Sequence, residues 1–323
     1  MKLFCVILFS ILPYLGLAQC PTTDIVMNTQ EDVDNFVLDY PGCTELLEAL
    51  IIDGNTIENL KGLGSIERIG GSLRILETGL THLMGLDQLQ SVGGEFQLQG
   101  NDMLIDLEGL FSLDSVLRLF IISNESLLSL DGLDALTTIE VPESIVIADN
   151  NSLVSINALS TVVNCPSCWI IISLNSNLTN LGGLENIPAS DIAFLGLTDN
   201  PMLVTCNLPN ICEYLVDGGT HEIENNAPGC ASQSDIVSNC LFSILENGLN
   251  PSVILLPNPV SEVLQIQLPE AFILRSTEVY SVLGELLIST SEETVDLSDA
   301  PNGIYFIAME TNFGDFMGKI LKQ

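Results

Sequence analysis

Basic residues are scarce in this sequence. The 323 residues include only eight Lys and Arg against 42 Asp and Glu, which gives a formal net charge of −34. A surface this negative repels nucleic acid and anionic lipid, so both are poor partners. Hydrophobic residues still make up 47% of the chain. We therefore expect a large apolar interior beneath an acidic, solvating surface, and not a disordered chain.

Catalytic signatures are also missing. The sequence has no H-E-x-x-H, no G-x-S-x-G and no phosphate-binding G-x-x-x-x-G-K-[ST]. Its two histidines, His82 and His221, lie in polar surroundings with no nucleophile or metal partner nearby in the sequence. No D-x-D-x-D-G loop is present, although the acidic surface leaves calcium binding open. We predict no enzymatic activity, no cofactor and no metal site.

The chain contains no apolar run long enough to span a bilayer once its first residues are removed. The segment MKLFCVILFSILPYLGLAQ has one Lys, a short apolar run and Gly16-x-Ala18, which is typical of a secretory signal peptide. We predict a signal over residues 1–18 with cleavage between Ala18 and Gln19. A lipoprotein anchored at Cys20 is the alternative, but Gln19 stands where a small residue is expected.

Cysteines occur in an even number after export. Cys5 leaves with the signal, and eight cysteines in an exported chain indicate disulfides between near neighbours. The pair Cys165-Pro-Ser-Cys168 has metal or redox chemistry as an alternative, but no second C-x-x-C accompanies it. We predict that all eight are structural: Cys20 and Cys43 before the repeats, Cys165 and Cys168 between repeats, and Cys206, Cys212, Cys230 and Cys240 after them.

One sequence motif recurs seven times between Leu50 and Cys206: apolar-x-apolar-x-x-Asn, followed by two further apolar anchors. The alternating pair predicts a short strand with two inward side chains, and the Asn predicts a turn where its amide bonds backbone groups. Thr78 replaces the Asn in the second copy. The predicted ladder of asparagines is Asn55, Asn101, Asn124, Asn150, Asn175 and Asn200.

Glycines recur at two further places in the repeat. A Gly-Leu step, as at Gly109-Leu110, predicts a tight bend or a close backbone approach. The pairs Gly70-Gly71 and Gly93-Gly94 are predicted to turn the chain into the next strand. One such unit cannot bury its own apolar edge, so we expect stacked coils. Seven coils at about 4.8 Å give a rod roughly 30 Å long.

The repeat resembles the receptor L-domain branch of leucine-rich-repeat-like solenoids, and residues 20–46 resemble the N-terminal cap of that family. The resemblance covers about residues 20–212 and implies a mainly β, parallel solenoid with a leaning toward protein binding. The ligand-contacting residues of the family do not map onto this chain. We expect an N-terminal cap over 19–46, a solenoid over 47–212 and a C-terminal cap over 213–245.

The repeat motif ends before a polar linker predicted at residues 246–252, and a different residue pattern follows it. Residues 253–323 alternate as short strands with turn signals at Gly284 and Asn302-Gly303, which indicates a small Ig-like antiparallel β-sandwich. This segment resembles the type A sorting domain of the bacterial type IX secretion system. The residues that carry the resemblance are Pro257, Asn258, Pro259, Gly284, Gly303, Tyr305, Lys319 and Lys322.

The sorting resemblance implies handling by the type IX secretion machinery and passage through the outer membrane of a Gram-negative bacterium. The mature protein is then secreted, either released or attached to the cell surface. Ligand contacts are expected where strand residues point away from the core. From the fourth coil onward these outward residues become apolar: Phe120, Ile122, Val146, Trp169, Ile171 and Phe194.

Two interpretations of this outward apolar patch stay open. It is either covered, by the Cys165–Cys168 segment, the cap or the sorting domain, or it is an open interaction face. The favoured function is non-enzymatic recognition or adhesion outside the cell, with a protein or glycan partner. The alternative is a secreted carbohydrate-active hydrolase or its glycan-binding accessory. A hydrolase would show a cleft with paired carboxylates.

Overall fold

A computed structural model describes residues 20–140, 145–246, 253–268, 273–282, 284–311 and 314–323. The predicted signal peptide, including Ala18 and Gln19, and residues 247–252 of the predicted linker lie outside this described part. The chain divides into two compact units, the first ending at Ala231 and the second running from Ser232 to Gln323. The predicted C-terminal cap is therefore split between the two units.

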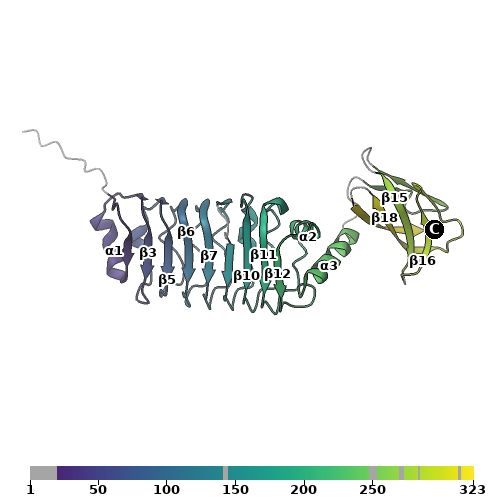
Figure 1. Ribbon diagram of the computed structural model, residues 1–323. Helices are drawn as coiled ribbons and strands as arrows, with labels where there is room; N and C mark the ends of the chain where they lie inside the picture. Colours follow the sequence, from purple (N-terminus) through teal and green to yellow (C-terminus); the bar gives the residue numbers. More distant parts are fainter. Residues whose placement is uncertain (1–19, 141–144, 247–252, 269–272, 283, 312–313) are drawn as a thin grey trace, which may run out of the picture. The chain divides into compact units, whose positions relative to one another are not determined.

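The first unit consists of short strands and a few short helices (Figure 1). Its helices are α1 (Gln30–Asp39), the 3₁₀ helices η1 (Lys61–Leu63), η2 (Asn157–Thr161) and η3 (Ala189–Asp191), and α2 (Pro209–Val216). Its strands are β1 (Ile25–Met27), β2 (Glu45–Leu46), β3 (Leu50–Asp53), β4 (Arg68–Ile69), β5 (Leu73–Leu76), β6 (Ser91–Gln99), β7 (Ser115–Ile122), β8 (Thr138–Ile139), β9 (Ile145–Ala148), β10 (Cys168–Ser173), β11 (Ile192–Thr198) and β12 (His221–Glu224).

These strands form one 12-stranded sheet in which every pairing is parallel. The main path runs β1-β3-β5-β6-β7-β9-β10-β11-β12, so each coil adds one strand beside the strand of the coil before it. Short strands β2, β4 and β8 extend a second ladder from β6 and β7. The chain thus forms a solenoid-like stack of coils, which we call the coil stack.

The core of the coil stack is built from the repeated apolar positions. The first anchor of each strand pairs with the first anchor of the next, as in Leu50 with Leu73 and Leu73 with Phe96. Both anchors of every strand from β3 to β11 are buried, and Leu50, Leu73 and Phe96 are 0% exposed. Strand alternation sends these residues to one side, so stacking coils buries a continuous apolar column.

Helix α1 covers the first coil. Thr29 caps it through its side chain, which accepts a hydrogen bond from Asp32 N, while the Asp32 carboxylate accepts from the Thr29 backbone. Hydrogen bonds from the Thr29 side chain and from the Asn28 and Thr29 backbones lower the pKa of Asp32. The buried face of α1 carries Val33 and Phe36.

One of the two glycine pairs acts differently from the prediction: Gly70-Gly71 lies at a bend between β4 and β5, but Gly93-Gly94 does not turn the chain. Gly93 and Gly94 lie inside the continuous strand β6, not at a turn. A Cβ on Gly93 would stand 2.5 Å from the Gly70 carbonyl oxygen, and one on Gly94 would stand 2.7 Å from the Gly71 carbonyl carbon. These residues are therefore needed because the backbones of successive coils approach closely here, and the strand passes from one ladder to the other across them.

The last strand of the sheet was not predicted. Residues 213–245 were expected to form only a cap, yet β12 continues the parallel sheet beyond β11, with Leu195 paired to His221. Helix α2 connects the two strands and begins with a proline at its first turn. The coil stack therefore extends beyond the seven repeats of the sequence by one strand at this end, and by β1 at the other.

The second unit contains α3 (Gln233–Glu246) and two antiparallel sheets. Buried residues from both sheets, among them Leu264 and Ile307, form one core, as the sandwich prediction required. The smaller sheet has the order β13-β14-β17 and the larger β16-β15-β18-β19. Their strands are β13 (Ile254–Leu256), β14 (Val263–Gln267), β15 (Leu274–Ser281), β16 (Leu286–Thr290), β17 (Thr294–Asp296), β18 (Gly303–Thr311) and β19 (Gly314–Lys322).

Candidate functional site

A ladder of asparagine side chains runs along the interior edge of the coil stack. Asn101, Asn124, Asn150, Asn175 and Asn200 are all 0% exposed. In each step the side-chain oxygen of one Asn accepts from the backbone N–H and the amide of the Asn one coil earlier, as Asn150 accepts from Asn124 at 3.1 and 3.0 Å. The Asn150 amide in turn donates to the carbonyls of Ile121 and Ala148. These bonds satisfy turn backbone groups that would otherwise be buried unpaired.

Both ends of the ladder differ from the prediction. Asn55 is exposed, and the ladder instead begins at Thr78, whose N–H and hydroxyl both donate to Asn101. The other end reaches Asn226, which accepts from the backbone and side chain of Asn200. The sequence signal for Asn226 was partial, because Ile223-x-x-Asn226 keeps the second anchor while His221 replaces the first.

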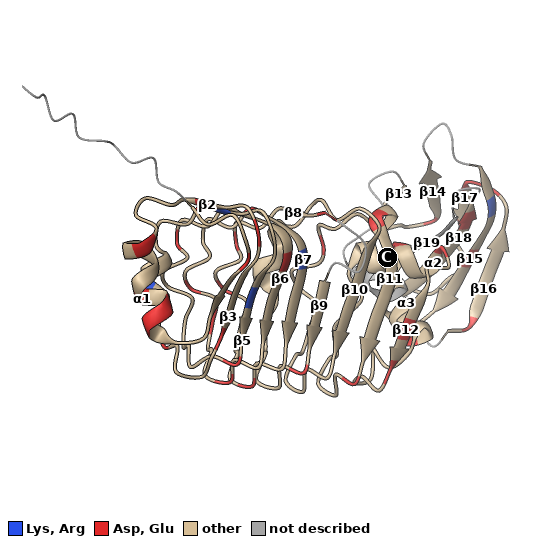
Figure 2. Cartoon of the chain, turned by 60° about the vertical axis from the view of Figure 1, so that its left-hand side comes forward, with Lys and Arg blue, Asp and Glu red and all other residues tan. Residues whose placement is uncertain are grey.

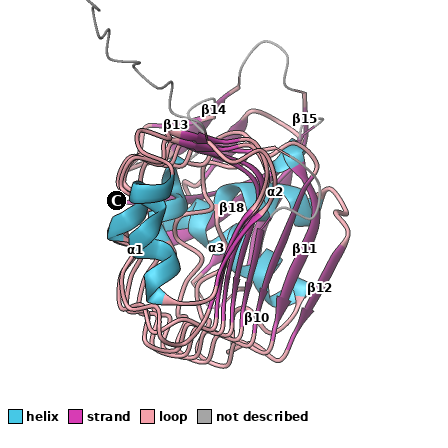
Figure 3. Ribbon diagram, turned by 90° about the vertical axis from the view of Figure 1, so that its left-hand side faces the viewer, coloured by secondary structure: helices cyan, strands magenta, loops and turns pink. Residues whose placement is uncertain are grey.

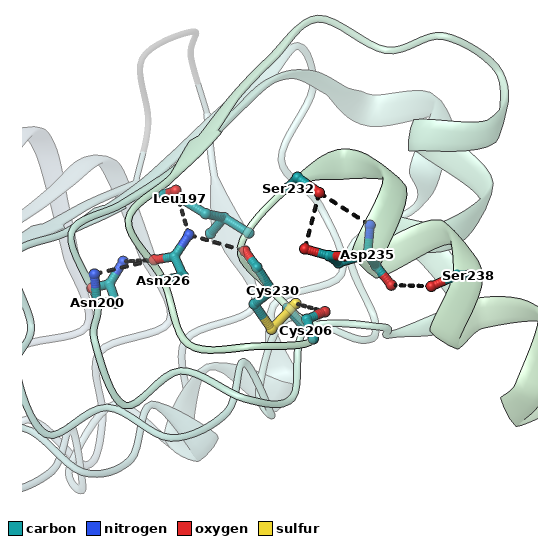
Figure 4. Close-up of a disulfide and its surroundings, with 9 residues drawn as sticks. Leu197, Asn200, Cys206, Asn226, Cys230, Ser232, Asp235 and Ser238 are labelled. Atoms are coloured by element: carbon teal, nitrogen blue, oxygen red, sulfur yellow. Dashed lines mark hydrogen bonds between the residues drawn. A yellow bond between two sulfur atoms is a disulfide. The ribbon is translucent and has the colours of Figure 1, made fainter.

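Disulfides close the coil stack near both ends. Cys20 is joined to Cys43 at the start, and Cys206 is joined to Cys230 around the last turn (Figure 4). In that turn Asn226 donates to the carbonyls of Leu197 and Cys230, so the ladder and the disulfide fix the same loop. Cys165 and Cys168 are joined to each other before β10. Cys212 and Cys240 are disulfide-bonded as well.

The six predicted patch residues lie on the outward face of the long sheet, and all six are half-buried. Viewed along the stack, the strands form one wall (Figure 3). The register brings the patch into rows across neighbouring strands. Phe120, Val146 and Ile171 form one row that ends at Gly196, Trp169 lies opposite Phe194 in a second, and Ile122 lies in a third. Strand alternation thus gathers these residues on one surface.

Trp169 and Phe194 form an aromatic pair on this face. Their ring centroids lie 5.3 Å apart with a tilt of 45° between the planes. Gly196 makes room for the pair, because a Cβ there would stand 3.1 Å from Phe194 Cε1. The pair has partial exposure, and Trp169 is the single tryptophan of the chain. Partly exposed Trp rings are common anchors at binding surfaces.

A hollow adjoins the aromatic pair. Thr220 lines it and stands opposite Phe194, since the following residues Leu195 and His221 are paired. The hollow has a volume of about 400 Å³ and is lined by Ala189, Ser190, Ala193, Glu213, Tyr214, Asp217, Gly218, Gly219 and Thr220. Hydroxyl, carboxylate and backbone groups from three segments therefore meet in a hollow that begins at Ala193, the residue before Phe194.

Tyr214 forms the floor of this hollow. Its ring packs against Gly219, where a Cβ would stand 2.3 Å from the ring, and its hydroxyl donates to the Thr220 carbonyl at 2.6 Å. Burial raises the pKa of Tyr214 above its usual value, so the hydroxyl stays protonated and keeps donating. This bond ties the end of α2 to the residue that precedes β12.

Charge is distributed unevenly over the coil stack. Residues 20–231 carry 30 Asp and Glu against four Lys and Arg, yet residues 150–184 carry no charged side chain at all. In Figure 2, strands β9, β10 and β11 are tan, which means that they contain no charged residue, whereas acidic residues, in red, recur along the loops. Of the four cations, Arg74 and Arg118 lie on the outward face near Glu95, with Arg74 Nε 3.4 Å from Glu95 Oε1. The acidic surface is thus interrupted around the aromatic pair.

A second cluster, of titratable side chains, is centred on His82, for which the sequence showed no partner. His82 Nδ1 lies 2.7 Å from Asp106 Oδ1, and Glu108 completes a group whose three ligand atoms lie within 4.8 Å of one another. Such a group could hold a metal ion, although His82 has no metal-ligating partner near it in the sequence. The partners are 24 and 26 residues away in the sequence, one coil later. His221 contacts the Gly219 carbonyl through Nδ1 at 2.8 Å.

The sorting-motif residues of the second unit join its first and last strands. The Asn258 amide donates to the Lys319 carbonyl, and its oxygen accepts from Leu321 N. Val260 and Gln323 continue this pairing with two backbone bonds. Pro257 and Pro259 both follow cis peptide bonds. Gly284 lies in the turn between β15 and β16, and Gly303 is the first residue of β18. The Tyr305 hydroxyl donates to the Pro301 carbonyl, and Lys322 is buried.

Comparison with known families identifies this second unit. The family described as secretion system C-terminal sorting domain matches residues 255–323. The tail is therefore a type IX secretion sorting domain, and the chain is a secreted or cell-surface protein. Among curated proteins, none matches this chain. The helices of the described residues are all too short or too polar to cross a membrane.

Proposed function

We propose that this is a non-enzymatic recognition or adhesion protein that acts outside the cell through the outward face of its coil stack. The observation that carries the proposal is the contiguous, partly exposed apolar surface across β7, β9, β10 and β11. Burial of the core does not require Phe120, Trp169 and Phe194 to point outward on β7, β10 and β11. The resemblance of the repeats to receptor L-domains, which bind ligands, supports the same function.

The alternative of a carbohydrate-active hydrolase is less well supported. Glycoside hydrolysis requires two carboxylates that flank the scissile bond. In the hollow, Glu213 is on α2 and Asp217 directly follows that helix, one helical turn apart, so both acids belong to the same wall. The other residues that line the hollow, Ala189, Ser190, Ala193, Tyr214, Gly218, Gly219 and Thr220, carry no carboxylate. This arrangement lacks the opposed pair that a glycosidase needs.

The proposal is tested with the full chain from residue 19 onward, immobilised and exposed to intact cells and to extracellular polymer preparations. Ile171→Glu places a charge in the centre of the face without touching the core. We expect bound material to fall at least tenfold, a loss of about 1.4 kcal/mol or more. Phe111→Ala, which removes an exposed aromatic from a loop away from this face, should bind like the original. Equal binding by Ile171→Glu would place the interaction elsewhere on the protein.

A further inference from the structure

The size of the outward apolar patch limits what can bind it. Four strands about 4.8 Å apart, each offering outward residues over about 13 Å of strand, present on the order of 300 Å². A stable protein interface takes about 800 Å² from each partner. The apolar area is therefore small for a folded protein, but it suits a ligand of a few rings that rests on Trp169 and Phe194.

The groups beside the aromatic pair define the chemistry of that ligand. The hollow offers hydroxyls of Ser190 and Thr220 and the exposed carboxylates of Glu213 and Asp217. Carboxylates accept hydrogen bonds from neutral hydroxyls strongly. A sugar ring has an apolar C–H face that packs on an aromatic ring and a rim of hydroxyls that need polar partners. Aromatic rings next to a polar hollow match both parts of a sugar.

The negative charge of the coil stack favours neutral sugars over acidic ones. With 30 acidic residues against four basic ones in residues 20–231, the coil stack repels anionic ligands. A ligand without charge does not experience this repulsion, and the uncharged segment 150–184, which contains Trp169, offers no ionic partner to a charged one. Uronic acids and sulfated sugars would place a negative group near Glu213 and Asp217.

We propose that Trp169, Phe194 and the adjoining hollow form a binding site for a neutral glycan. Trp169 and Phe194 stack on the apolar face of one sugar unit, and Glu213 and Asp217 accept hydrogen bonds from the hydroxyls of a neighbouring unit. The row of Ile171, Val146 and Phe120 extends the contact along the glycan chain. This inference rests on the proposed recognition function and names the class of its ligand.

The test uses the mature chain on a printed array of neutral and acidic oligosaccharides, followed by titration of the best neutral oligosaccharide. Because Trp169 is the single tryptophan, its fluorescence reports binding to the unmodified protein. We expect a saturable change in emission and an affinity that is unchanged between about 0.05 and 0.5 M NaCl, since a neutral ligand is not screened. Emission that fails to change on binding would place the glycan away from Trp169 and overturn the assignment.

Variants then separate stacking from hydrogen bonding. Phe194→Ala should weaken the array hit about tenfold or more, and Glu213→Gln should weaken it less, while Phe111→Ala serves as the matched aromatic control. A blank array of neutral sugars, or unchanged affinity in Phe194→Ala, overturns the proposal. If cell binding still depends on Ile171 while the array is blank, the partner is a protein: the glycan inference fails and the recognition function stands.

Discussion

The asparagines of the ladder each use their whole amide. Asn150 accepts two hydrogen bonds from Asn124 and donates two to main-chain carbonyls, all at 3.1 Å or less. An aspartate lacks the two donors and a leucine lacks every partner, so neither can replace it. Thr78 begins the ladder, and no earlier coil donates a hydrogen bond to it. A hydroxyl that only donates to Asn101 is therefore enough at this position.

Replacing one ladder residue should therefore be costly. Asn150→Ala leaves the Asn124 N–H buried without its partner and removes the side-chain bonds to the Ile121 and Ala148 carbonyls, and we expect a loss of about 3 kcal/mol in the free energy of unfolding. Urea denaturation of the purified mature chain measures this loss. Asn55→Ala, at the exposed position outside the ladder, should change stability by less than about 0.5 kcal/mol. Similar losses in the two variants would show that the ladder has no special role.

At the level of the coil, the Gly-Leu step is a corner that only glycine can form. Gly85, Gly109, Gly132 and Gly183 have φ between +109° and +116°. At Gly132 a Cβ would stand 2.1 Å from the Leu107 carbonyl oxygen of the coil before it. Ala158 is tolerated at the equivalent place because that coil forms the helix η2 instead. Two different backbone shapes thus fill the same corner.

Gly132→Ala combines a strained φ with this clash, and we expect it to destabilise the coil stack by about 3 kcal/mol. Thermal unfolding followed by circular dichroism measures the effect. Gly218→Ala is the matched control, because Gly218 also has positive φ, +82°, but has open space where the Cβ would stand. It should lose only about 1 kcal/mol. If Gly218→Ala is equally damaging, the backbone conformation and not the packing of coils sets the cost.

Much of the coil could be predicted because period-two alternation and a recurrent Asn are local signals. The inward anchors and the outward patch followed directly from alternation, as Phe96 and Phe120 show. The role of Gly93-Gly94 could not be predicted, because the close approach involves Gly70-Gly71 one coil earlier. Asn55 was misjudged for a related reason: its repeat is one residue shorter after the asparagine than the later ones, and the neighbouring coil offers Thr78 and not an asparagine.

The hollow could not be predicted from the sequence, because the segments that line it are brought together only by the fold. Its lining comes from the η3 region, from α2 and from the segment before β12, which carry no shared motif. Likewise His82 meets Asp106 only because one coil stacks on the next. Residues that meet only because coils stack on one another do not recur at a fixed spacing in the sequence, so no pattern predicts their contact. The aromatic pair could be predicted because both of its members occupy the same outward position of the repeat.

Across the whole molecule, the proposed recognition face and the sorting domain belong to different units. The sorting domain closes on itself through Asn258, which bonds both Lys319 and Leu321. Removing residues 255–323 should leave the protein inside the producing cell, because the segment that matches the sorting family is gone. Immunoblots of cell, surface and medium fractions check this. The full-length Phe194→Ala chain, with an intact sorting domain, should be exported normally, and truncated protein in the medium would contradict the prediction.

The disulfides near the two ends of the coil stack have a consequence for its lifetime. A terminal coil has a neighbour on one side only, so a stack of this kind normally frays from its ends. Here Cys20–Cys43 and Cys206–Cys230 tie both terminal coils. Unravelling must then begin at an internal coil, where two interfaces have to open together. Proteases outside the cell cleave chains that have opened locally, so the protein can persist there even at ordinary equilibrium stability.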